Sequence, residues 1–402
     1  MAEILILKLA IILLLAKALG ELFKKVHMPS LLGEVLAGII LGPPILGFIG
    51  GEEFLTVVAE IGIILAIFVA GFEQGNIQEL LKHKETSILI SGLSSTLPIL
   101  AVVFIAQYQG FSLLTSLFLA VGLGATSMGV SLRSLEGVNE IRTKVGKTVI
   151  GSLVINDITG LLLLTGVATY AGIILSGSGS ILWEMGYALG SVLLSFIIFY
   201  VGMKSIPRLT HRFIHLKVEE AQFSFAIIVI LGLAWFAASF GLSSIIGAFV
   251  AGLILSRSPV FETKTFHEKI LSVSYGFFIP IFFVMTGTHL TFANFWENAL
   301  RALLFLGVIA TVQVGCAFLA TRFFNYSKRE GLVVGLGMLP YGEVTLVVMT
   351  ALLGLVESNS SAFAGQDIQG LFSSVLILIL LTVILTPLAM KLVNKTMKAS
   401  KT

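Results

Sequence analysis

Apolar residues occur along this chain in long blocks separated by short polar segments. A block of about 18 apolar residues or more is long enough to cross a membrane as a helix. The pattern predicts an all-α polytopic membrane protein, with a single membrane domain over residues 1–402. Its thirteen predicted spans, of which the ninth is short, cover residues 4–22, 30–49, 54–73, 87–107, 112–133, 147–173, 182–203, 221–238, 242–256, 271–290, 299–321, 330–355 and 368–390.

Composition supports the membrane assignment and excludes several other classes. The chain is 56% hydrophobic and 12% charged, whereas soluble domains carry about 25% charged residues. The single cysteine, Cys316, excludes a disulfide framework and a cysteine metal cluster. The spans contain no histidine pair, Cys/His arrangement or Ser-His-Asp set. We therefore expect neither an enzyme nor a bound cofactor.

Lys and Arg are concentrated in every second segment between the predicted spans. Every Lys and Arg except Lys8, Lys17 and Arg301 follows an odd-numbered span. By the positive-inside rule these segments and the C-terminus are predicted to be cytoplasmic, with the N-terminus outside the plasma membrane. Lys24 and Lys25 follow the first span rather than precede it, so we do not expect a cleaved signal peptide.

Three short sequences recur later in the chain at offsets of 213 to 216 residues. Residues 31–41 are echoed at 245–255, 67–71 at 283–287, and 122–129 at 335–342. Seven predicted spans separate the copies, so the second copy enters the membrane in the opposite direction. This predicts inverted-topology repeats over about 30–173 and 242–390. Recurrent helix-packing glycines are the alternative explanation.

The third echoed pair predicts two broken helices. Glycines surround Thr126 and Ser127 in the first copy, while Pro340 and Gly342 flank Tyr341 in the second. Glycine costs about 1 kcal/mol and proline about 3 kcal/mol inside a helix. Unwound backbone at these places would offer carbonyl and hydroxyl oxygens to a cation, and helix ends would add dipoles. A kink filled by neighbouring helices is the alternative.

Acidic residues inside apolar spans are the main candidates for chemistry, because an intramembrane charge is costly and usually functional. Asp157 lies about ten residues into its span, roughly 15 Å deep at the helical rise, and Glu343 is similarly deep. We expect Glu60 to be a buried, paired acid that supports the core. Glu34 and Glu73 lie nearer span ends and are interpreted as structural or vestibule residues.

Asp157 is the predicted binding site for both an alkali cation and a proton. Buried carboxylates titrate nearer neutral pH than exposed ones, and such a group can hold a proton or a dehydrated cation but not both. Thr126, Ser127 and Asn156 are expected to supply neutral oxygens beside it. A hydrogen-bonded structural acid is the alternative for Asp157, and helix packing is the alternative for Asn156.

Several motifs together resemble the monovalent cation:proton antiporter-2 family, the NapA-like and Kef-like exchangers. They are "GEVLAGIILGP" (33–43), "GATSMGVSLRSLEG" (124–137), "VIGSLVINDITGLLLL" (149–164), "GFFIPIFFVMTG" (276–287) and "GMLPYGE" (337–343). The resemblance implies Asp157 as the cation-binding carboxylate, Thr126 in the first broken helix, and Pro340 to Glu343 as the second. It also implies an antiporter that contributes to pH homeostasis.

The same resemblance implies a fold and an assembly. It implies a homodimer of thirteen-helix protomers that work by elevator-type alternating access. The dimerisation part would comprise about 1–73 and 221–290, and the ion-binding core about 87–173 and 299–390. Residues 182–203 would form the linker helix, and two broken helices would cross in the core.

Three positions depart from the electrogenic members of that family. Asn156 stands where they have a second acid, Gln313 where they have a lysine, and Tyr341 where they usually have an arginine. One remaining carboxylate can exchange one proton for one cation, so we expect electroneutral 1:1 antiport. Na⁺ is the expected cation, with K⁺/H⁺ antiport of the Kef type as an alternative. A passive cation channel of related fold is a further alternative, although a channel needs a continuous polar path.

Overall fold

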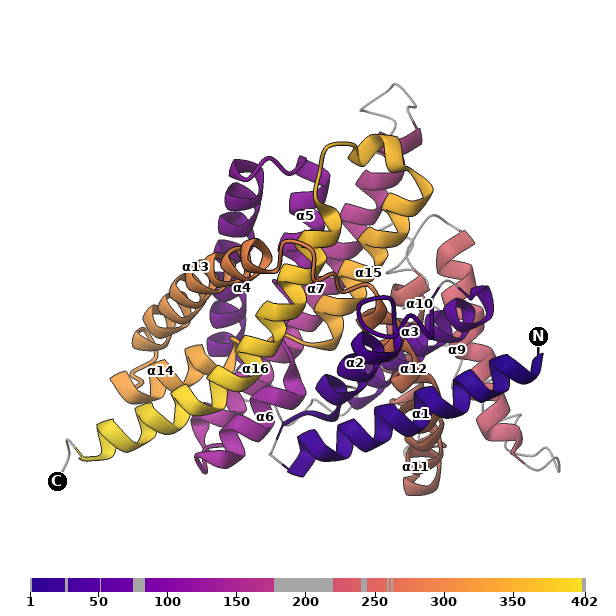
Figure 1. The fold of residues 1–402 in the computed structure, drawn as a ribbon. Coiled ribbons are helices and arrows are strands. Elements are labelled where there is room, and N and C mark those ends of the chain that lie inside the picture. The colour runs from indigo at the N-terminus through magenta and orange to yellow at the C-terminus, as the bar shows by residue number, and fades with distance from the viewer. Residues whose placement is uncertain are drawn as a thin grey trace.

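The computed structural model describes residues 2–25, 28–50, 52–74, 84–176, 220–239, 244–258, 260–261 and 263–399. The predicted span 182–203 lies outside these residues. Within them the secondary structure is helical (Figure 1). The helices are α1 (Ala2–Lys25), α2 (Ser30–Leu41), α3 (Glu53–Gln74), α4 (Lys84–Tyr108), α5 (Leu113–Gly122), α6 (Met128–Gly137), α7 (Lys144–Ser176), α9 (Ala221–Ser239), α10 (Ser244–Leu255), α11 (Lys264–Val273), α12 (Ile279–Thr288), α13 (Phe295–Arg322), α14 (Lys328–Gly337), α15 (Glu343–Ser358) and α16 (Ile368–Ala399). A π-helical turn, Ser274–Phe278, joins α11 to α12.

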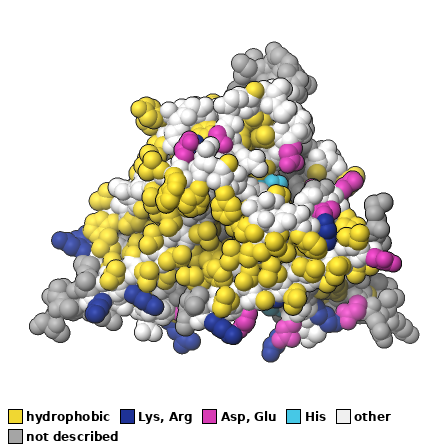
Figure 2. Space-filling view, in the orientation of Figure 1, with side chains coloured by type: hydrophobic (Ala, Val, Ile, Leu, Met, Phe, Trp, Pro, Cys, Tyr) yellow, Lys and Arg dark blue, Asp and Glu magenta, His cyan; other side chains and the backbone are white. Residues whose placement is uncertain are grey.

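The helices have the length and surface of a membrane protein. Among the described residues, 7 helices are long and apolar enough to cross a membrane, and α2 and α5 are shorter apolar helices. Figure 2 shows a broad apolar band across the molecule, with many Lys and Arg side chains along its lower edge. The prediction of an all-helical protein with several membrane spans is therefore confirmed.

The second predicted span is shorter as a helix than the apolar pattern suggested. The pattern continued to residue 49, but α2 ends at Leu41. Pro43 and Pro44 follow, and proline cannot donate the backbone hydrogen bond that would extend the helix. The chain then folds back, and the N–H of Phe48 donates to the carbonyl of Leu41 at 2.8 Å. Apolar composition alone did not distinguish this turn from helix.

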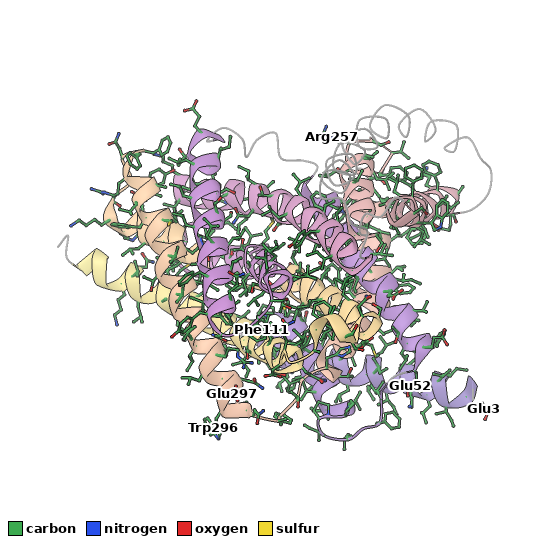
Figure 3. The ribbon with its side chains drawn as sticks, turned by 90° about the horizontal axis from the view of Figure 1, so that it is seen from above. Glu3, Glu52, Phe111, Arg257, Trp296 and Glu297 are labelled. Atoms are coloured by element: carbon green, nitrogen blue, oxygen red, sulfur yellow. The ribbon has the colours of Figure 1, made fainter. Side chains whose placement is uncertain are left out.

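The helices pack in two groups. In one group, α2 packs on α1 and α12, and α10 packs on α3 and α9. In the other, α4 packs on α5, α7 and α13, while α14 and α16 pack on α13. Helix α15 packs on α5 within the second group and also contacts α3 of the first. Figures 1 and 3 show these groups in two perpendicular views.

The echoed glycines occupy equivalent places in two helix pairs. A Cβ on Gly33 of α2 would lie 2.4 Å from the carbonyl carbon of Leu19 in α1. A Cβ on Gly247 of α10 would lie 2.5 Å from the carbonyl carbon of Leu233 in α9. Real Cβ atoms do not approach backbone so closely, so both positions require glycine. Leu19 and Leu233 are separated by 214 residues, as are Gly33 and Gly247.

A second pair of echoed glycines makes contacts between the two copies of the repeat. Gly38 of α2 lies against Gly287 of α12, where an added Cβ would be 3.0 Å from the Gly287 Cα. Gly252 of α10 lies against Gly71 of α3, where an added Cβ would be 2.9 Å from the Gly71 carbonyl carbon. Each copy of the 31–41 sequence thus packs on the other copy's equivalent of 67–71.

Candidate functional site

Both stretches predicted to be weak helix are breaks, and the two breaks touch. Helix α5 ends at Gly122 and α6 begins at Met128, while α14 ends at Gly337 and α15 begins at Glu343. The backbone N–H of Ser127 donates to the carbonyl oxygen of Pro340 at 2.7 Å. The Oγ of Ser131, one turn into α6, lies 2.7 Å from the carbonyl oxygen of Gly337. The sequence prediction of two broken helices is therefore matched by two joined breaks.

Two helix N-termini face this junction. Ser127 is the N-cap residue of α6, and Gly342 is the N-cap residue of α15. Each N-terminus carries the positive end of a helix dipole. The carboxylate of Glu343, the first residue of α15, accepts a hydrogen bond from the Ser127 Oγ at 3.3 Å. The carboxyl group of this acid therefore lies at the place where the N-termini of α6 and α15 meet.

Gln313 holds the second break from the side. It is buried in α13 at 1% exposure, and its Oε1 accepts a hydrogen bond from the Tyr341 hydroxyl at 2.7 Å. Its Nε2 donates to the carbonyl oxygen of Met338. The N–H of Tyr341 also donates to the Oγ1 of Thr382 in α16 at 3.3 Å. One glutamine thus binds both sides of the unwound segment.

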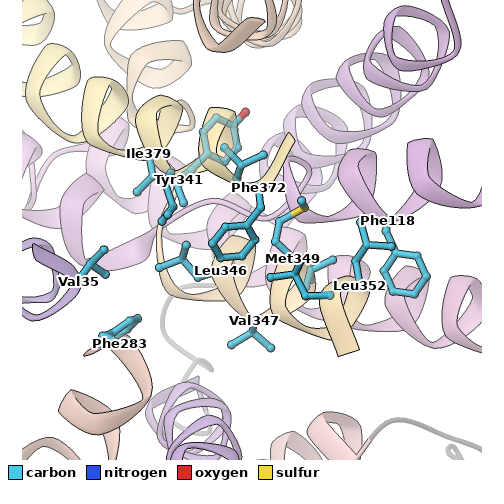
Figure 4. Packing of buried hydrophobic residues seen from close by; sticks show 14 of the residues in the cluster. Val35, Phe118, Phe283, Tyr341, Leu346, Val347, Met349, Leu352, Phe372 and Ile379 are labelled. Carbon is cyan, nitrogen blue, oxygen red and sulfur yellow. The ribbon is translucent and has the colours of Figure 1, made fainter. Parts of the chain in front are cut away.

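The Tyr341 ring fixes the same segment through apolar packing. The side chain is fully buried, at 0% exposure. Figure 4 shows it near Leu346 of α15 and near Phe372 and Ile379 of α16, all members of one buried cluster. Hydrogen bonds and packing therefore position Pro340 and Tyr341 together.

The predicted ion-binding residues Asn156 and Asp157 are buried in α7. Their exposed fractions are 1% and 7%. One turn further along α7, a Cβ added to Gly160 would lie 3.5 Å from the Cβ of Ala125, so α7 passes directly beside the first break. Thr126, the next residue in that break, has a buried Oγ1 with no hydrogen-bond partner among the described residues. A buried carboxylate, a buried amide and a buried hydroxyl thus lie on adjoining segments.

Sequence reasoning missed two serines that contact Asn156. Ser91 and Ser95 lie one turn apart on α4, and both Oγ atoms lie at hydrogen-bond distance from the Asn156 Oδ1. Both serines are buried. The signal available in the sequence was the i, i+4 spacing of small polar residues on an otherwise apolar helix, "ISGLSS".

Glu60 does not belong to this site. The sequence suggested a buried, paired acid, but the structure places Glu60 on the exposed face of α3. Val57 and Phe54, about one and two turns earlier on that face, are each 49% exposed. Hydropathy gives the depth of a residue along a span but not the direction in which its side chain points. The expectation of a core-supporting Glu60 was therefore wrong.

Glu34 is a buried acid near a span end, and the structure identifies its partner. The carboxylate is buried, and the Nζ of Lys17 in α1 lies 3.5 Å from it. The same Nζ donates to the carbonyl oxygen of Tyr275 at 2.6 Å, in the π-helical turn before α12. This ion pair ties α1, α2 and the π-helical turn together, consistent with the structural interpretation of Glu34.

Among the described residues, no group of three or more His, Cys, Asp or Glu side chains could hold a metal ion. Two touching helix breaks beside a buried carboxylate are instead the arrangement of a secondary active transporter, where discontinuous helices bind the substrate ion near the middle of the membrane. Fold and site thus define a transport protein.

Comparison with known proteins gives the family. Residues 10–393 match the model of the sodium/hydrogen exchanger transmembrane family. The chain belongs to this family of membrane cation/proton antiporters and is not an enzyme.

Individual relatives cover nearly the whole chain. The Na(+)/H(+)-K(+) antiporter GerN of Bacillus cereus is 31% identical over 98% of this chain and 98% of its own length. The Na(+)/H(+) antiporter of Enterococcus hirae is 26% identical over 97% of this chain and 98% of its own length. The structure of the sodium proton antiporter MjNhaP1 from Methanocaldococcus jannaschii shares the fold, with a TM-score of 0.73 at 18% identity over 97% of each chain.

Proposed function

We propose that this protein exchanges Na⁺ for H⁺ at Asp157, with K⁺ and Li⁺ as competing cations. The supporting observation is the position of this buried carboxylate on α7, which passes beside the break that carries Thr126. Cation and proton compete for the same carboxylate, so binding of one releases the other. The names of relatives bear on the cation: GerN is described as a Na(+)/H(+)-K(+) antiporter, and a yeast relative, 27% identical, is a K(+)/H(+) antiporter.

We further propose that the exchange is electroneutral, one cation for one proton. The residue before Asp157 is an amide, and the buried side chain that binds the second break is Gln313, another amide. A single carboxylate that is either protonated or cation-bound carries the same charge in both forms. Antiport in proteoliposomes should therefore create no membrane potential. Cation-driven proton movement that builds a potential would contradict this stoichiometry.

The proposed mechanism is elevator-type movement of a core against a dimerisation part, within a homodimer of thirteen-helix protomers. Support comes from the two groups of packed helices and from the equal offsets of Gly33 with Gly247 and of Leu19 with Leu233. These offsets are expected of an inverted repeat. In this proposal the N-terminus is outside the cell and the C-terminus is cytoplasmic, as the positive-inside rule predicts.

The decisive experiment compares wild type with Asp157→Asn in proteoliposomes of matched protein content. Proton efflux is measured when Na⁺, K⁺ or Li⁺ gradients are applied separately. We expect exchange by wild type and none by Asp157→Asn, because an amide cannot titrate. Glu357→Gln, at an exposed position on α15, is the control and should retain activity. Coupled exchange by Asp157→Asn would rule out the proposed site, and ion flux without proton coupling would favour the channel alternative.

A further inference from the structure

The side-chain amide of Asn156, on α7, contacts serine hydroxyls of α4 in a buried place. One of these hydroxyls faces two acceptor oxygens but has a single proton to donate. The Oγ of Ser95 lies 2.6 Å from the Asn156 Oδ1 and also 2.6 Å from the carbonyl oxygen of Ser91. A serine hydroxyl has one proton to donate. If it donates to one of these oxygens, the other faces its lone pairs at close range. This arrangement cannot satisfy both contacts.

The nitrogen end of the same amide is a donor that lacks an acceptor. The Nδ2 of Asn156 is buried and has no hydrogen-bond partner among the described residues. A buried donor left unpaired costs about 1–3 kcal/mol. The two ends of a side-chain amide are nearly the same size, so its hydrogen bonds decide which end faces which neighbour.

Turning the amide by half a revolution removes the shortage of protons toward α4 and pairs the nitrogen, so that the unpartnered buried atom is an acceptor instead of a donor. Nδ2 then faces α4 and donates its two hydrogens to the Oγ atoms of Ser91 and Ser95. The hydroxyl of Ser95 keeps its hydrogen bond to the Ser91 carbonyl oxygen, 2.6 Å away. The Asn156 Oδ1 then occupies the buried position away from α4.

We infer that Ser91 and Ser95 are positioning residues that hold the Asn156 amide with its nitrogen toward α4 and its oxygen toward the ion site. This inference rests on the proposed function. The serines accept from the amide, so they fix its rotation without using its oxygen. Oδ1 is thereby available as a neutral ligand for a dehydrated monovalent cation held by the adjacent Asp157. Such a ligand affects cation binding more than it affects the proton, which binds the carboxylate directly.

The first test is the apparent KM for Na⁺ of Ser91→Ala/Ser95→Ala, measured beside kcat and the pH profile in proteoliposomes. Without the serines the amide is free to rotate, and we expect KM for Na⁺ to rise about three- to tenfold, the equivalent of roughly one hydrogen bond. The maximal rate and the pH profile at saturating Na⁺ should change little. Ser95→Ala alone should give a smaller rise.

Ser94→Ala is the matched control. Ser94 is equally buried on α4, but its hydroxyl donates to the carbonyl of Ile90 in its own helix. Its KM should stay at the wild-type value. Stabilisation of purified protein by NaCl, measured as a shift in melting temperature, gives a second readout without transport. It should be reduced in the double variant and unchanged in Ser94→Ala.

The direction of the KM change decides the inference. If Oδ1 faces the serines instead, their removal releases Oδ1, and KM for Na⁺ should fall or stay constant, which would overturn it. In an Asn156→Ala background the serine substitutions should cause no further rise in KM, and an additive rise would also overturn it. Absence of cation/proton exchange by wild type would instead refute the proposed function.

Discussion

The backbone N–H of Ser127 donates to the carbonyl oxygen of Pro340 at 2.7 Å, and this hydrogen bond joins the two helix breaks. The residues come from segments separated by more than 200 positions in the chain. A donor left free by the start of α6 is satisfied by an acceptor in the segment before α15. Each break therefore stabilises the unwound form of the other.

Gly342→Ala should disrupt this junction. A Cβ at Gly342 would lie 2.9 Å from both the Cβ and the Oγ of Ser127, so the start of α15 must move away from the first break. We expect a loss of about 1–3 kcal/mol of stability from overpacking, and a large loss of exchange activity. Gly354→Ala, later in α15, is the control because its added Cβ meets nothing within 4 Å. Melting temperature and proteoliposome transport measure the two effects, and equal behaviour of both variants would argue against a tight junction.

Tyr341→Phe should weaken the second break without changing the size of its side chain. The substitution leaves the buried Oε1 of Gln313 without the donor now 2.7 Å away. An unsatisfied buried acceptor costs about 1–3 kcal/mol, so the melting temperature in detergent should fall. Gln313→Leu should cost at least as much, because it also removes the donor to the Met338 carbonyl. The double variant should cost less than the sum of the two, since both substitutions remove one shared hydrogen bond. Strict additivity would show that the bond is not formed.

Arg329→Met should destabilise the end of the core where α14 begins. The Arg329 guanidinium pairs with the carboxylate of Glu140 and donates from Nε to the Oδ1 of Asn394 at 3.1 Å. Glu140 is only 8% exposed, so it would be left as a nearly buried, unpaired charge. Because the pair retains some solvent contact, we expect a loss of about 2–3 kcal/mol. Lys328→Met, at the exposed neighbouring position, should change the melting temperature little, and a similar loss in both variants would contradict this role of the pair.

Stability at acidic pH should depend on Glu52, in the segment between α2 and α3. Partial burial would raise the pKa of this carboxyl, but hydrogen bonds from the Lys8 ammonium and the Gly50 N–H outweigh burial and hold the pKa below its ordinary value. A pKa lowered by folding adds stability above the ordinary carboxyl pKa, and that stability is lost as pH falls through the folded pKa. Figure 3 labels Glu52 and, near the N-terminus of α1, Glu3.

Glu52→Gln tests this contribution. Compared with wild type, the variant should have a lower melting temperature at neutral pH and a smaller further decrease on acidification to about pH 3, which is below the ordinary carboxyl pKa. Glu53→Gln, at an exposed adjacent position, is the control and should follow the wild-type pH dependence. Identical pH dependence in wild type and Glu52→Gln would exclude this contribution.

Properties that depend only on residues close together in the sequence could be predicted from the sequence. The long apolar blocks predicted helices, because a helix satisfies its backbone hydrogen bonds internally whatever surrounds it. Glycine and proline at 122–129 and 335–342 predicted the two breaks through their low helix propensity. The depth of Asp157 followed from counting residues along its span. The motifs that resemble the cation:proton antiporters were also readable without coordinates.

Contacts between distant segments were decided only by the tertiary structure. Position along a span gave no indication that Asp157 is buried while Glu60 faces outward on α3. Neither the binding of Gln313 to both sides of the second break nor the contact of Ser91 and Ser95 with Asn156 follows from helix propensity. The physical reason is that hydropathy and helix propensity are averages over consecutive residues, so they carry no information about contacts with distant segments. The rotation of each helix about its axis is instead set by packing against helices that are remote in sequence.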